Sequence, residues 1–509
     1  MYVIDRHNNI HDHRGRFTGK QPKPRGGSKS LLGRASYPKL VVLDSSALMA
    51  IDAIRSVGGH PMLVGGCVRD PLIDSGLVSK DIDIEVYGVS DVDQLSEALR
   101  SVGRVDEVGR SFGVLKVQVG DRDFDVSLPR RDSKTGDGHR GFDIQPDADL
   151  SEKEATGRRD FTINALMWDP NTEEIVDCWG GLEDVENGIL RHTTDAFSED
   201  PLRVLRGVQF AARFGFHLAP ETAELCRSLV DAYSELPKER IWGEFEKIGT
   251  KGTNITSCLT ALQESGWDRH FPRLTALYGV EQDPAHHPEG DVIVHTGLAA
   301  DVAARMADEA HLTGEDRFVA VMAALTHDFG KAEHTQHVEQ PDGSIKITSH
   351  GHAEGGVEPA VEFLESIGTP KRIIERIAPI IREHMCTSSG DPTPAAVRRL
   401  ARRLVPATLE EWSLVVGADR GGRGSDNYKN PATKWLAVAA NIGVEKRPVK
   451  GLLTGNHLIA AGMSPGPEFK AILADSLSAQ DNGEFSDEAG AIEWFYNLAF
   501  VRRESERLE

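Results

Sequence analysis

The chain has 509 residues, and at roughly 100–200 residues per domain we expect three or four domains. Charged residues make up 27% and hydrophobic residues 39% of the chain, which excludes a fully disordered protein. No apolar run approaches the roughly 18 residues of a membrane helix, and residues 1–15 contain no apolar signal segment. The five cysteines are scattered and form no CxxC pair. These features predict a cytoplasmic protein with reduced thiols and no membrane partner.

The charge is distributed unevenly along the chain. The net charge of −21 argues, taken alone, against nucleic acid as a partner, because phosphate contacts need Lys and Arg. Residues 1–40, however, contain nine Lys or Arg and two Asp, a local charge of +7 that leaves −28 for the rest. Any RNA binding must therefore use local basic patches.

Local patterns divide the chain into an N-terminal tail, an α/β head and a long helical half. Residues 1–38 are rich in Gly, Pro and basic residues and have no hydrophobic period, which predicts a flexible basic tail. In residues 39–190, PMLVGG, DIDIEVYG, VLKVQVG and FDVSLP predict strands and QLSEALRSV predicts a helix. From about residue 195 helical periodicity dominates, with connections predicted at 283–291 and 388–394.

A strand that ends in two glycines precedes a pair of aspartates in the head. In LVGGCVRD (63–70), Gly65 and Gly66 let backbone N–H groups approach phosphate oxygens, and Arg69 would add a cationic fork. In KDIDIEV (80–86), Asp81 and Asp83 stand two residues apart, so both carboxylates face one side of a strand. Two carboxylates on one face suit a pair of Mg²⁺ ions and predict metal-dependent phosphoryl or nucleotidyl transfer.

The same aspartates also fit a simpler structure. An amphipathic strand would hold Asp81, Asp83 and Glu85 in water and the intervening apolar residues in the core. The ordered combination of the two motifs favours the metal site. FDVSL (124–128) then offers Asp125 as a third carboxylate, for which the alternative is an exposed acid at a strand edge.

The segment TGRRDFTINAL (156–166) offers charges that suit a nucleotide. Arg158 and Arg159 supply a phosphate-facing charge, and Asp160 supplies an acceptor for ribose hydroxyls. The alternative is a helix N-terminus capped by Asp160 or Thr162.

The segment SEDPLRVLRGVQFAARFGF (198–216) predicts a helix with Pro201 in its first turn. Asp200 and Arg203 are three residues apart and hence neighbours on one helix face. An Asp accepts from an exocyclic amine and an Arg donates to ring nitrogens or carbonyls, so the pair can recognise base edges. The alternative is an ordinary surface ion pair.

The helical half contains a spaced series of His and Asp residues. Adjacent His327 and Asp328 point about 100° apart on a helix, so other helices must complete any metal site. Mixed imidazole and carboxylate ligands suit Mg²⁺ or a divalent transition metal. The alternative to metal binding, for any single histidine, is that it lies at the surface or caps a helix. The candidate ligands are His295, His327, Asp328 and Asp419, with His352 and His384 for a possible second ion.

The ordered series GGCVRD, DID, RRDFT, DCWGG and EDPLR, within about residues 60–220, resembles the class II bacterial tRNA nucleotidyltransferases, or CCA-adding enzymes. These share an ancestor with bacterial poly(A) polymerase. The His and Asp series resembles the HD phosphohydrolase domain that some of these enzymes carry, where it is linked to phosphatase and 2′,3′-cyclic phosphodiesterase activities. The resemblance implies an α+β protein with a polymerase-beta-like nucleotidyltransferase head and a mixed sheet, followed by all-α parts. We expect the head at 39–190, the neck at 191–285, the HD domain at 286–430 and a C-terminal RNA-binding module at 431–509.

The resemblance also implies roles for individual residues in addition of C and A to tRNA from CTP and ATP. Asp81 and Asp83 would hold catalytic Mg²⁺, and the HD residues would hold a divalent metal. The nucleotide-binding residues would be Gly65, Gly66 and Arg69 for the triphosphate, Arg159 and Asp160 near the ribose, Glu199, Asp200 and Arg203 as the base template, and Arg206 for phosphates.

Three other functions compete with CCA addition. Poly(A) polymerases usually carry G-[RK]-[RK]-F after the metal strands, whereas this chain has VGRSF (108–112), in which Ser111 breaks the basic doublet. A phosphohydrolase whose head only binds nucleotide, or a non-catalytic RNA scaffold, would not require both DID and EDPLR to be intact. The loop PLIDSGLVSK (71–80) departs from the family, and VRRLARRL (397–404) is a candidate RNA-backbone contact.

Overall fold

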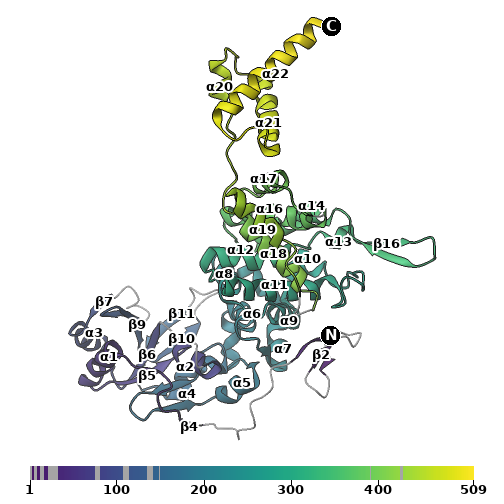
Figure 1. Ribbon diagram of the computed structural model, residues 1–509. Coiled ribbons are helices and arrows are strands. Elements are labelled where there is room, and N and C mark those ends of the chain that lie inside the picture. The colour runs from purple at the N-terminus through teal and green to yellow at the C-terminus, as the bar shows by residue number, and fades with distance from the viewer. Residues whose placement is uncertain are drawn as a thin grey trace. The chain divides into compact units, whose positions relative to one another are not determined.

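The computed structural model divides the chain into two compact units, Met1–Pro272 and Arg273–Glu509, and each is described by itself (Figure 1). The structure describes residues 3–4, 9–11, 17–20, 33–74, 81–106, 114–134, 142–147, 149–389, 391–424 and 428–508. Residues 75–80 of the predicted loop at 71–80 and the whole VGRSF motif therefore lie outside the described residues. Among the described helices, none is long and apolar enough to cross a membrane.

A mixed eight-stranded sheet forms the head, as the resemblance implied. Its only parallel pair among the described strands is β6 with β9, and all other neighbours are antiparallel. The strand order is β4 (Gly33–Ser36), β13 (Glu174–Asp177), β12 (Met167–Asp169), β5 (His60–Val64), β6 (Ile82–Tyr87), β9 (Arg122–Ser127), β8 (Val114–Val119) and β7 (Arg104–Asp106).

The core of the head lies between this sheet and the helices α1 (Ser45–Ser56) and α3 (Val92–Arg100). Ile84 of β6 is fully buried in this core. Because alternate residues of a strand face opposite sides, burial of Ile84 directs the side chains of Asp83 and Glu85 to the other face of the sheet.

The head begins earlier than the sequence predicted. Strand β4, at residues 33–36, pairs with β13 through Ala35 and Ile175, so the predicted tail at 1–38 ends too late. The segment GRAS has no hydrophobic period, and its pairing depends on the edge that β13 offers. Short strands β1 (Val3–Ile4), β2 (Asn9–His11) and β3 (Phe17–Lys20) form a separate sheet, and the remainder of the predicted tail lies outside the described residues.

The rest of the first unit is mainly helical. Helix α6 (Leu202–Phe214) confirms the helix predicted after Pro201 and packs on α8 (Lys238–Lys251) and α9 (Ile255–Ser265). In the chain, α7 (Pro220–Ser228) lies between α6 and α8. The predicted neck at 191–285 extends beyond Pro272, where the first unit ends.

The second unit is built on α11 (Val292–Glu309), α12 (Gly314–Thr326) and α18 (Leu409–Gly421). Small side chains let these helices approach closely, since the distance between helices depends on the residues at their contact. Ala303, Ala320 and Ala418, one from each helix, belong to one buried cluster. The surrounding helices are α13 (Lys331–His334), α14 (His352–Gly355), α15 (Val357–Ser366) and α16 (Lys371–Glu383), with the 3-10 helix η6 (His384–Ser389).

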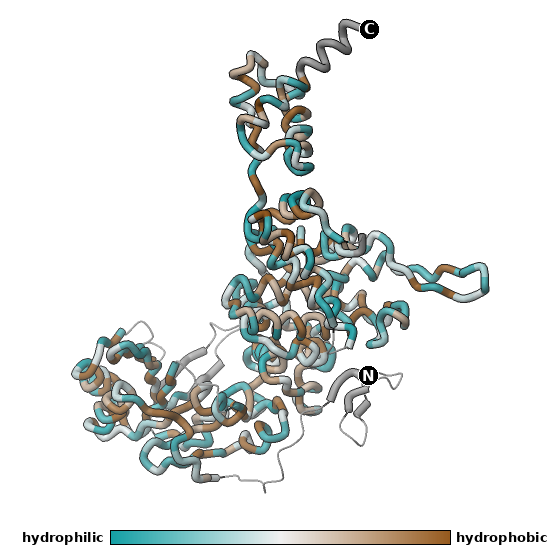
Figure 2. Tube along the Cα trace, viewed as in Figure 1, coloured by the Kyte–Doolittle hydropathy of each residue, from teal (hydrophilic) through white to brown (hydrophobic). Residues whose placement is uncertain are grey.

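An exposed hairpin interrupts the helices of the second unit. Strands β16 (Gln336–Glu339) and β17 (Ile345–Thr348) pair with each other, and the hairpin is drawn mostly in hydrophilic colours (Figure 2). Its apolar residues Val338 and Ile345 are 40% and 66% exposed. The sequence did not predict this hairpin because its strands are short and polar, so no buried face marks them.

The basic helix α17 (Pro394–Arg403) contacts the C-terminal module rather than presenting all its arginines to solvent. Arg402 forms an ion pair with Asp481, which is 3% exposed, and Arg398 donates to the Asp481 carbonyl at 2.7 Å. The C-terminal module comprises α20 (Gly455–Ala460), α21 (Pro467–Asn482) and α22 (Glu488–Leu508) around its own apolar cluster. Both arginines thus have a structural role here.

Asp481→Ala should destabilise the docking of α21 on α17. Removing one partner of a buried ion pair leaves the other charge uncompensated and costs about 3–5 kcal/mol. Urea unfolding and limited proteolysis would measure the loss. The control is Asp391→Ala, which removes an exposed ion pair with Lys434 and should cost less than about 1 kcal/mol. Equal losses in the two variants would contradict the buried contact.

Candidate active site and metal centre

Three predicted carboxylates come together on the sheet of the head. Asp83 pairs in register with Val64 of β5 and with Asp125 of β9, and Asp81 directly precedes β6. Paired residues on neighbouring strands project to the same face, so Asp83 and Asp125 lie side by side. Burial raises the pKa of Asp83; nearby Arg159 opposes this rise, whereas Asp125 and Asp81 add to it. A divalent cation would relieve this clustering of acids, so the residues fit the predicted metal site.

Gly65 allows the phosphate-binding segment to approach these acids. It follows β5 with φ +73°, and a Cβ atom there would lie 2.9 Å from Oδ2 of Asp83. Helix α2 (Gly66–Ile73) starts at the next residue, which leaves its first backbone N–H groups free of partners within the helix. Such an N-terminus binds anions, and here it adjoins the acids that would hold the metal.

Arg69 lies inside the fold instead of facing this segment. Its guanidinium donates to Asp70 at 2.8 Å, contacts Asn164, and lies 4.9 Å from the ring centroids of Phe210 and Phe214. In this structure Arg69 therefore connects α2 to α6, and its contact with a triphosphate stays a prediction.

The segment 158–160 connects the sheet to α6. Arg158 and Arg159 pair with Glu85 at 3.1 and 3.4 Å, and Asp160 accepts from Arg206 at 2.6 Å. Burial opposes ionisation of Asp160, but Arg206 and hydrogen bonds from Asn164 and the Phe161 N–H outweigh it and lower the pKa to about 2.

Two of the simpler alternatives for these residues are wrong. The short 3-10 helix η2 (Thr162–Asn164) has Phe161 at its N-cap and no side-chain cap, so Asp160 and Thr162 are not capping residues. Glu85 is fully buried, so the acids of β6 do not all lie in water.

Asp200 and Arg203 do not pair with each other. Arg240 of α8 holds the Asp200 carboxylate at 2.8 and 3.2 Å. Arg203 donates instead to the backbone carbonyls of Ala196 and Arg158, at 2.7 and 2.8 Å. The simple ion-pair alternative is therefore wrong, and each side chain is fixed independently. A pocket of about 580 Å³ beside them is lined by Arg130, Leu150, Lys153, Glu154, Gly157, Arg158, Trp179, Thr194, Ala196 and Glu199.

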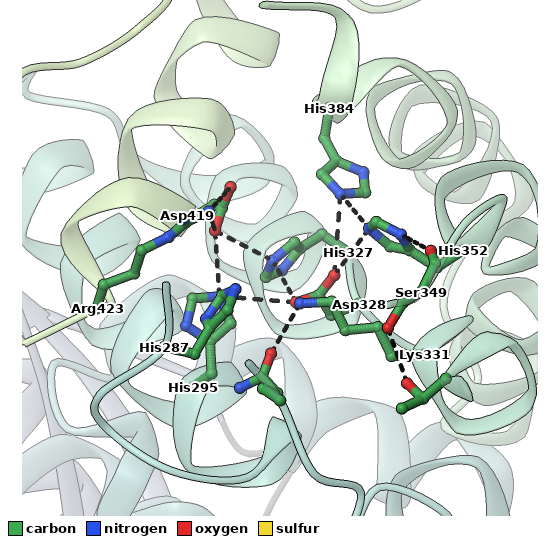
Figure 3. Close-up of polar contacts among 12 residues, drawn as sticks. His287, His295, His327, Asp328, Lys331, Ser349, His352, His384, Asp419 and Arg423 are labelled. Atoms are coloured by element: carbon green, nitrogen blue, oxygen red, sulfur yellow. Dashed lines mark hydrogen bonds and ion pairs between the residues drawn. The ribbon is translucent and has the colours of Figure 1, made fainter. Parts of the chain in front are cut away.

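All six predicted metal ligands of the second unit converge on one point (Figure 3). They come from five parts of the fold and are nearly or completely buried. The set consists of His295 on α11, His327 and Asp328 directly after α12, His352 on α14, His384 directly after α16, and Asp419 on α18.

The imidazole rings are oriented with one nitrogen outward and one toward the centre. The Nδ1 atoms of His327, His352 and His384 lie 2.6–2.7 Å from backbone carbonyls. This contact selects the tautomer in which Nε2 carries a lone pair for a metal. The buried Nε2 atoms of His295 and His327 have no well-aligned hydrogen bond. The residues therefore fit a divalent cation.

Asp328 divides the cluster into two halves. Its Oδ2 lies 3.2 Å from His327 Nε2 and 3.6 Å from His295 Nε2. Its Oδ1 lies 3.3 Å from His352 Nε2 and 3.9 Å from His384 Nε2. One carboxylate thus faces two sets of nitrogens, an arrangement suited to a pair of ions.

Three further residues of this centre, His287, Glu289 and Lys331, were not predicted from the sequence. Glu289 Oε1 contacts Nδ1 of both His287 and His295, at 2.8 and 2.7 Å. Burial lowers the pKa of His295, but Asp419 and Glu289 outweigh burial and raise it to about 9. Lys331 Nζ lies 2.6 Å from Oδ2 of Asp328. His287 and Glu289 lie in a turn, where no sequence periodicity marks them. Lys331 could have been predicted, because HDFGK places it one helical turn after Asp328.

Comparison with known proteins supports both the nucleotidyltransferase head and the HD domain. A family model for the poly A polymerase head domain matches residues 62–191, and one for the HD domain matches residues 292–415. The multifunctional CCA protein of Nitrosococcus oceani is 33% identical over 414 residues, which cover 79% of this chain and 93% of that protein. The protein of the same name from Xanthomonas campestris pv. campestris is 34% identical over 435 residues, covering 82% and 97%. This chain belongs to the family of multifunctional CCA proteins.

Solved structures of CCA-adding enzymes share the fold. The Bacillus stearothermophilus CCA-adding enzyme in complex with CTP matches 90% of this chain and 98% of its own, with a TM-score of 0.63 and 21% identity. The Thermotoga maritima enzyme complexed with tRNA matches 92% and 100%, with a TM-score of 0.52 and 19% identity. The resemblance inferred from GGCVRD, DID and EDPLR is confirmed.

Gly65→Ala should reduce nucleotide addition by at least about a hundredfold. A methyl group there would displace the Asp83 carboxylate, and roughly 2.7 kcal/mol of lost transition-state stabilisation corresponds to that factor. The assay is nucleotide incorporation per folded protein. The control is Gly180→Ala, where φ is +79° but nothing lies within 4 Å of the added atom, so activity should persist. Comparable activity in both variants would contradict the close approach.

Proposed function

We propose that this protein adds C and A to the 3′ end of tRNA, using CTP and ATP, by two-metal nucleotidyl transfer. The row of carboxylates at Asp81, Asp83 and Asp125, beside the N-terminus of α2, supports this proposal most directly. Family membership supports the same activity. The five cysteines are free, which agrees with action in the reducing cytoplasm.

In the proposed reaction, the tRNA 3′ hydroxyl attacks the α-phosphorus of the nucleotide and pyrophosphate leaves. Asp81 and Asp83, with Asp125 beside them, would hold Mg²⁺; when bound, this ion supplies Lewis-acid activation of a hydroxyl and positive charge for the phosphate oxygens. Gly65 and Gly66 would bind the triphosphate through backbone N–H groups, and Arg159 would add positive charge beside Asp83. Nucleotidyl transfer requires the metal-binding carboxylates and the triphosphate-binding glycines to lie close together, because the reacting groups must be held in the correct geometry.

Base selection would use Asp200 and Arg203, held apart from each other. C and A both present an amine donor, whereas U and G present a carbonyl at the corresponding position. A carboxylate fixed by Arg240 accepts from the amine and repels the carbonyl. Arg203, fixed by two backbone carbonyls, retains N–H groups that can donate to the ring nitrogen. Glu199 lies next to this pair, on the wall of the pocket.

Purified protein should extend tRNA that ends at the discriminator base by CCA when given CTP and ATP together. Asp83→Asn should lower this activity more than about a hundredfold, because the shape is retained but the metal loses a charged ligand. Gel resolution of products with CTP, ATP and both would measure it. Asp52→Asn, an exposed change on α1, is the control. Long A tails on any RNA would instead indicate a poly(A) polymerase.

We also propose a second activity, metal-dependent phosphohydrolysis at the HD centre. The convergence of four histidines and two aspartates around buried Asp328 supports it. Imidazole and carboxylate ligands suit Mg²⁺ or a divalent transition metal, and phosphate monoesters and 2′,3′-cyclic phosphates are the substrates to test. Lys331, beside Asp328, would add positive charge for a phosphate oxygen.

Metal content should separate the two halves of this centre. With Mn²⁺ as the probe, Asp328→Ala should remove both ions, because its two oxygens face both sets of nitrogens. His384→Ala should remove only the ion on the Oδ1 side. Elemental analysis after desalting gives the stoichiometry, with the exposed His337→Ala as control. Identical stoichiometry in Asp328→Ala and the control would exclude the site.

A further inference from the structure

We propose that buried Glu85 is a positioning residue for nucleotide selection, because it couples the metal-binding strand β6 to the base-reading Arg203 through the segment 158–160. This inference rests on the proposed nucleotidyl transfer and extends it. Glu85 touches neither the proposed metal nor the base, so its effect would pass through the arginines that it holds.

The surroundings of Glu85 differ from those of the other acids on β6. It is fully buried, whereas Asp81 is exposed and Asp83 is partly exposed. Its Oε1 accepts from the Tyr87 hydroxyl at 2.8 Å. Its Oε2 pairs with Arg158 at 3.1 Å and with Arg159 at 3.4 Å. Burying a carboxylate is unfavourable unless it is paired, so the contacts with Tyr87, Arg158 and Arg159 are what allow Glu85 to be buried.

Arg158 links this carboxylate to the base-reading side chain. Its guanidinium contacts Glu85, and its backbone carbonyl accepts from Arg203 Nη2 at 2.8 Å. A shift of the Arg158 side chain would displace the carbonyl that holds Arg203. Two residues later, Asp160 binds Arg206 on the same helix as Arg203. The segment 158–160 therefore connects β6 to α6 at two points.

Arg159 links the same carboxylate to the metal-binding acids. Its Nη1 lies 3.9 Å from the Cβ position of Gly65, and its charge opposes the raised pKa of Asp83. Glu85 pairs with Nη2 of this guanidinium, so part of the Arg159 charge is compensated by Glu85 and not by Asp83. Without the negative charge of Glu85, Arg159 would be free to pair with Asp83 and compete with a cation there.

Removing the negative charge of Glu85 should have two consequences that general destabilisation of the fold would not produce. The concentration of Mg²⁺ for half-maximal activity should rise, because Arg159 competes for Asp83. Discrimination of CTP and ATP against UTP should fall, because Arg203 loses its fixed carbonyl. We expect a change of about tenfold in each, which corresponds to roughly 1.4 kcal/mol.

The experiment compares Glu85→Gln, which keeps the shape and removes the charge, with Glu85→Asp, which keeps the charge. For each we would measure incorporation of CTP, ATP and UTP on tRNA lacking CCA, the Mg²⁺ dependence, and the affinity of the protein for CTP and UTP. The matched control is Asp184→Asn, a buried acid that pairs with Arg191 at 3.2 Å in the same unit. All values are normalised to the folded fraction from thermal unfolding.

The expected result is lower selectivity and a higher Mg²⁺ requirement in Glu85→Gln, partial recovery in Glu85→Asp, and neither change in Asp184→Asn. Equal proportional loss with all three nucleotides and unchanged Mg²⁺ dependence would overturn the proposal. Wild-type protein that prefers CTP to UTP in binding but does not extend tRNA would overturn the proposed function alone, since binding selectivity still tests Glu85. Wild-type protein without that preference would overturn both.

Discussion

The parallel pairing of β6 with β9 is the constraint on which the head depends. It sets Asp83 beside Asp125, and the buried Ile84 prevents the strand from turning over. A slip of one residue would move every side chain of β6 to the opposite face, placing acids in the apolar core and isoleucines on the face that now carries the acids. The hydrophobic core and the acidic row are therefore stabilised by the same register.

Ion pairs between buried acids and arginines connect the sheet of the head to the helices around it. Glu85, Asp70 and Asp160 are buried, and each pairs with arginine. Because an isolated buried charge is costly, these pairs define where α2, segment 158–160 and α6 can lie. In the second unit, backbone carbonyls orient three of the imidazoles. Glu289 contacts His295, and Arg423 pairs with Asp419. Both sites are thus shaped by contacts outside the residues that would touch a ligand.

The sequence predicted strands β5, β6, β8 and β9 and helices α3 and α6, because their hydrophobic periods are clear. It also predicted that His295 and Asp419, 124 residues apart, belong to one centre, through the ordered motif series. It did not predict that Arg69 lies inside the fold or that Arg240 holds Asp200, since both depend on contacts between distant elements. Glu85 was visible in the alternation of DIDIE, but a strand pattern alone does not tell whether an acidic face is covered. The short strand β4 and the hairpin β16–β17 had no hydrophobic period to mark them.

The hairpin lies in the chain between the two halves of the metal centre, joining α13 to α14. Its base is closed where the Thr335 and Ser349 hydroxyls approach within 2.8 Å, and the Ser349 carbonyl contacts His352 Nδ1. The path beyond this closure is exposed and pairs only with itself among the described strands. The positions of the metal ligands therefore do not depend on the hairpin tip, so the length and even the continuity of the chain at the tip can vary during evolution. A break in the chain at Gly343 would leave the contacts of Ser349 with Thr335 and His352 intact.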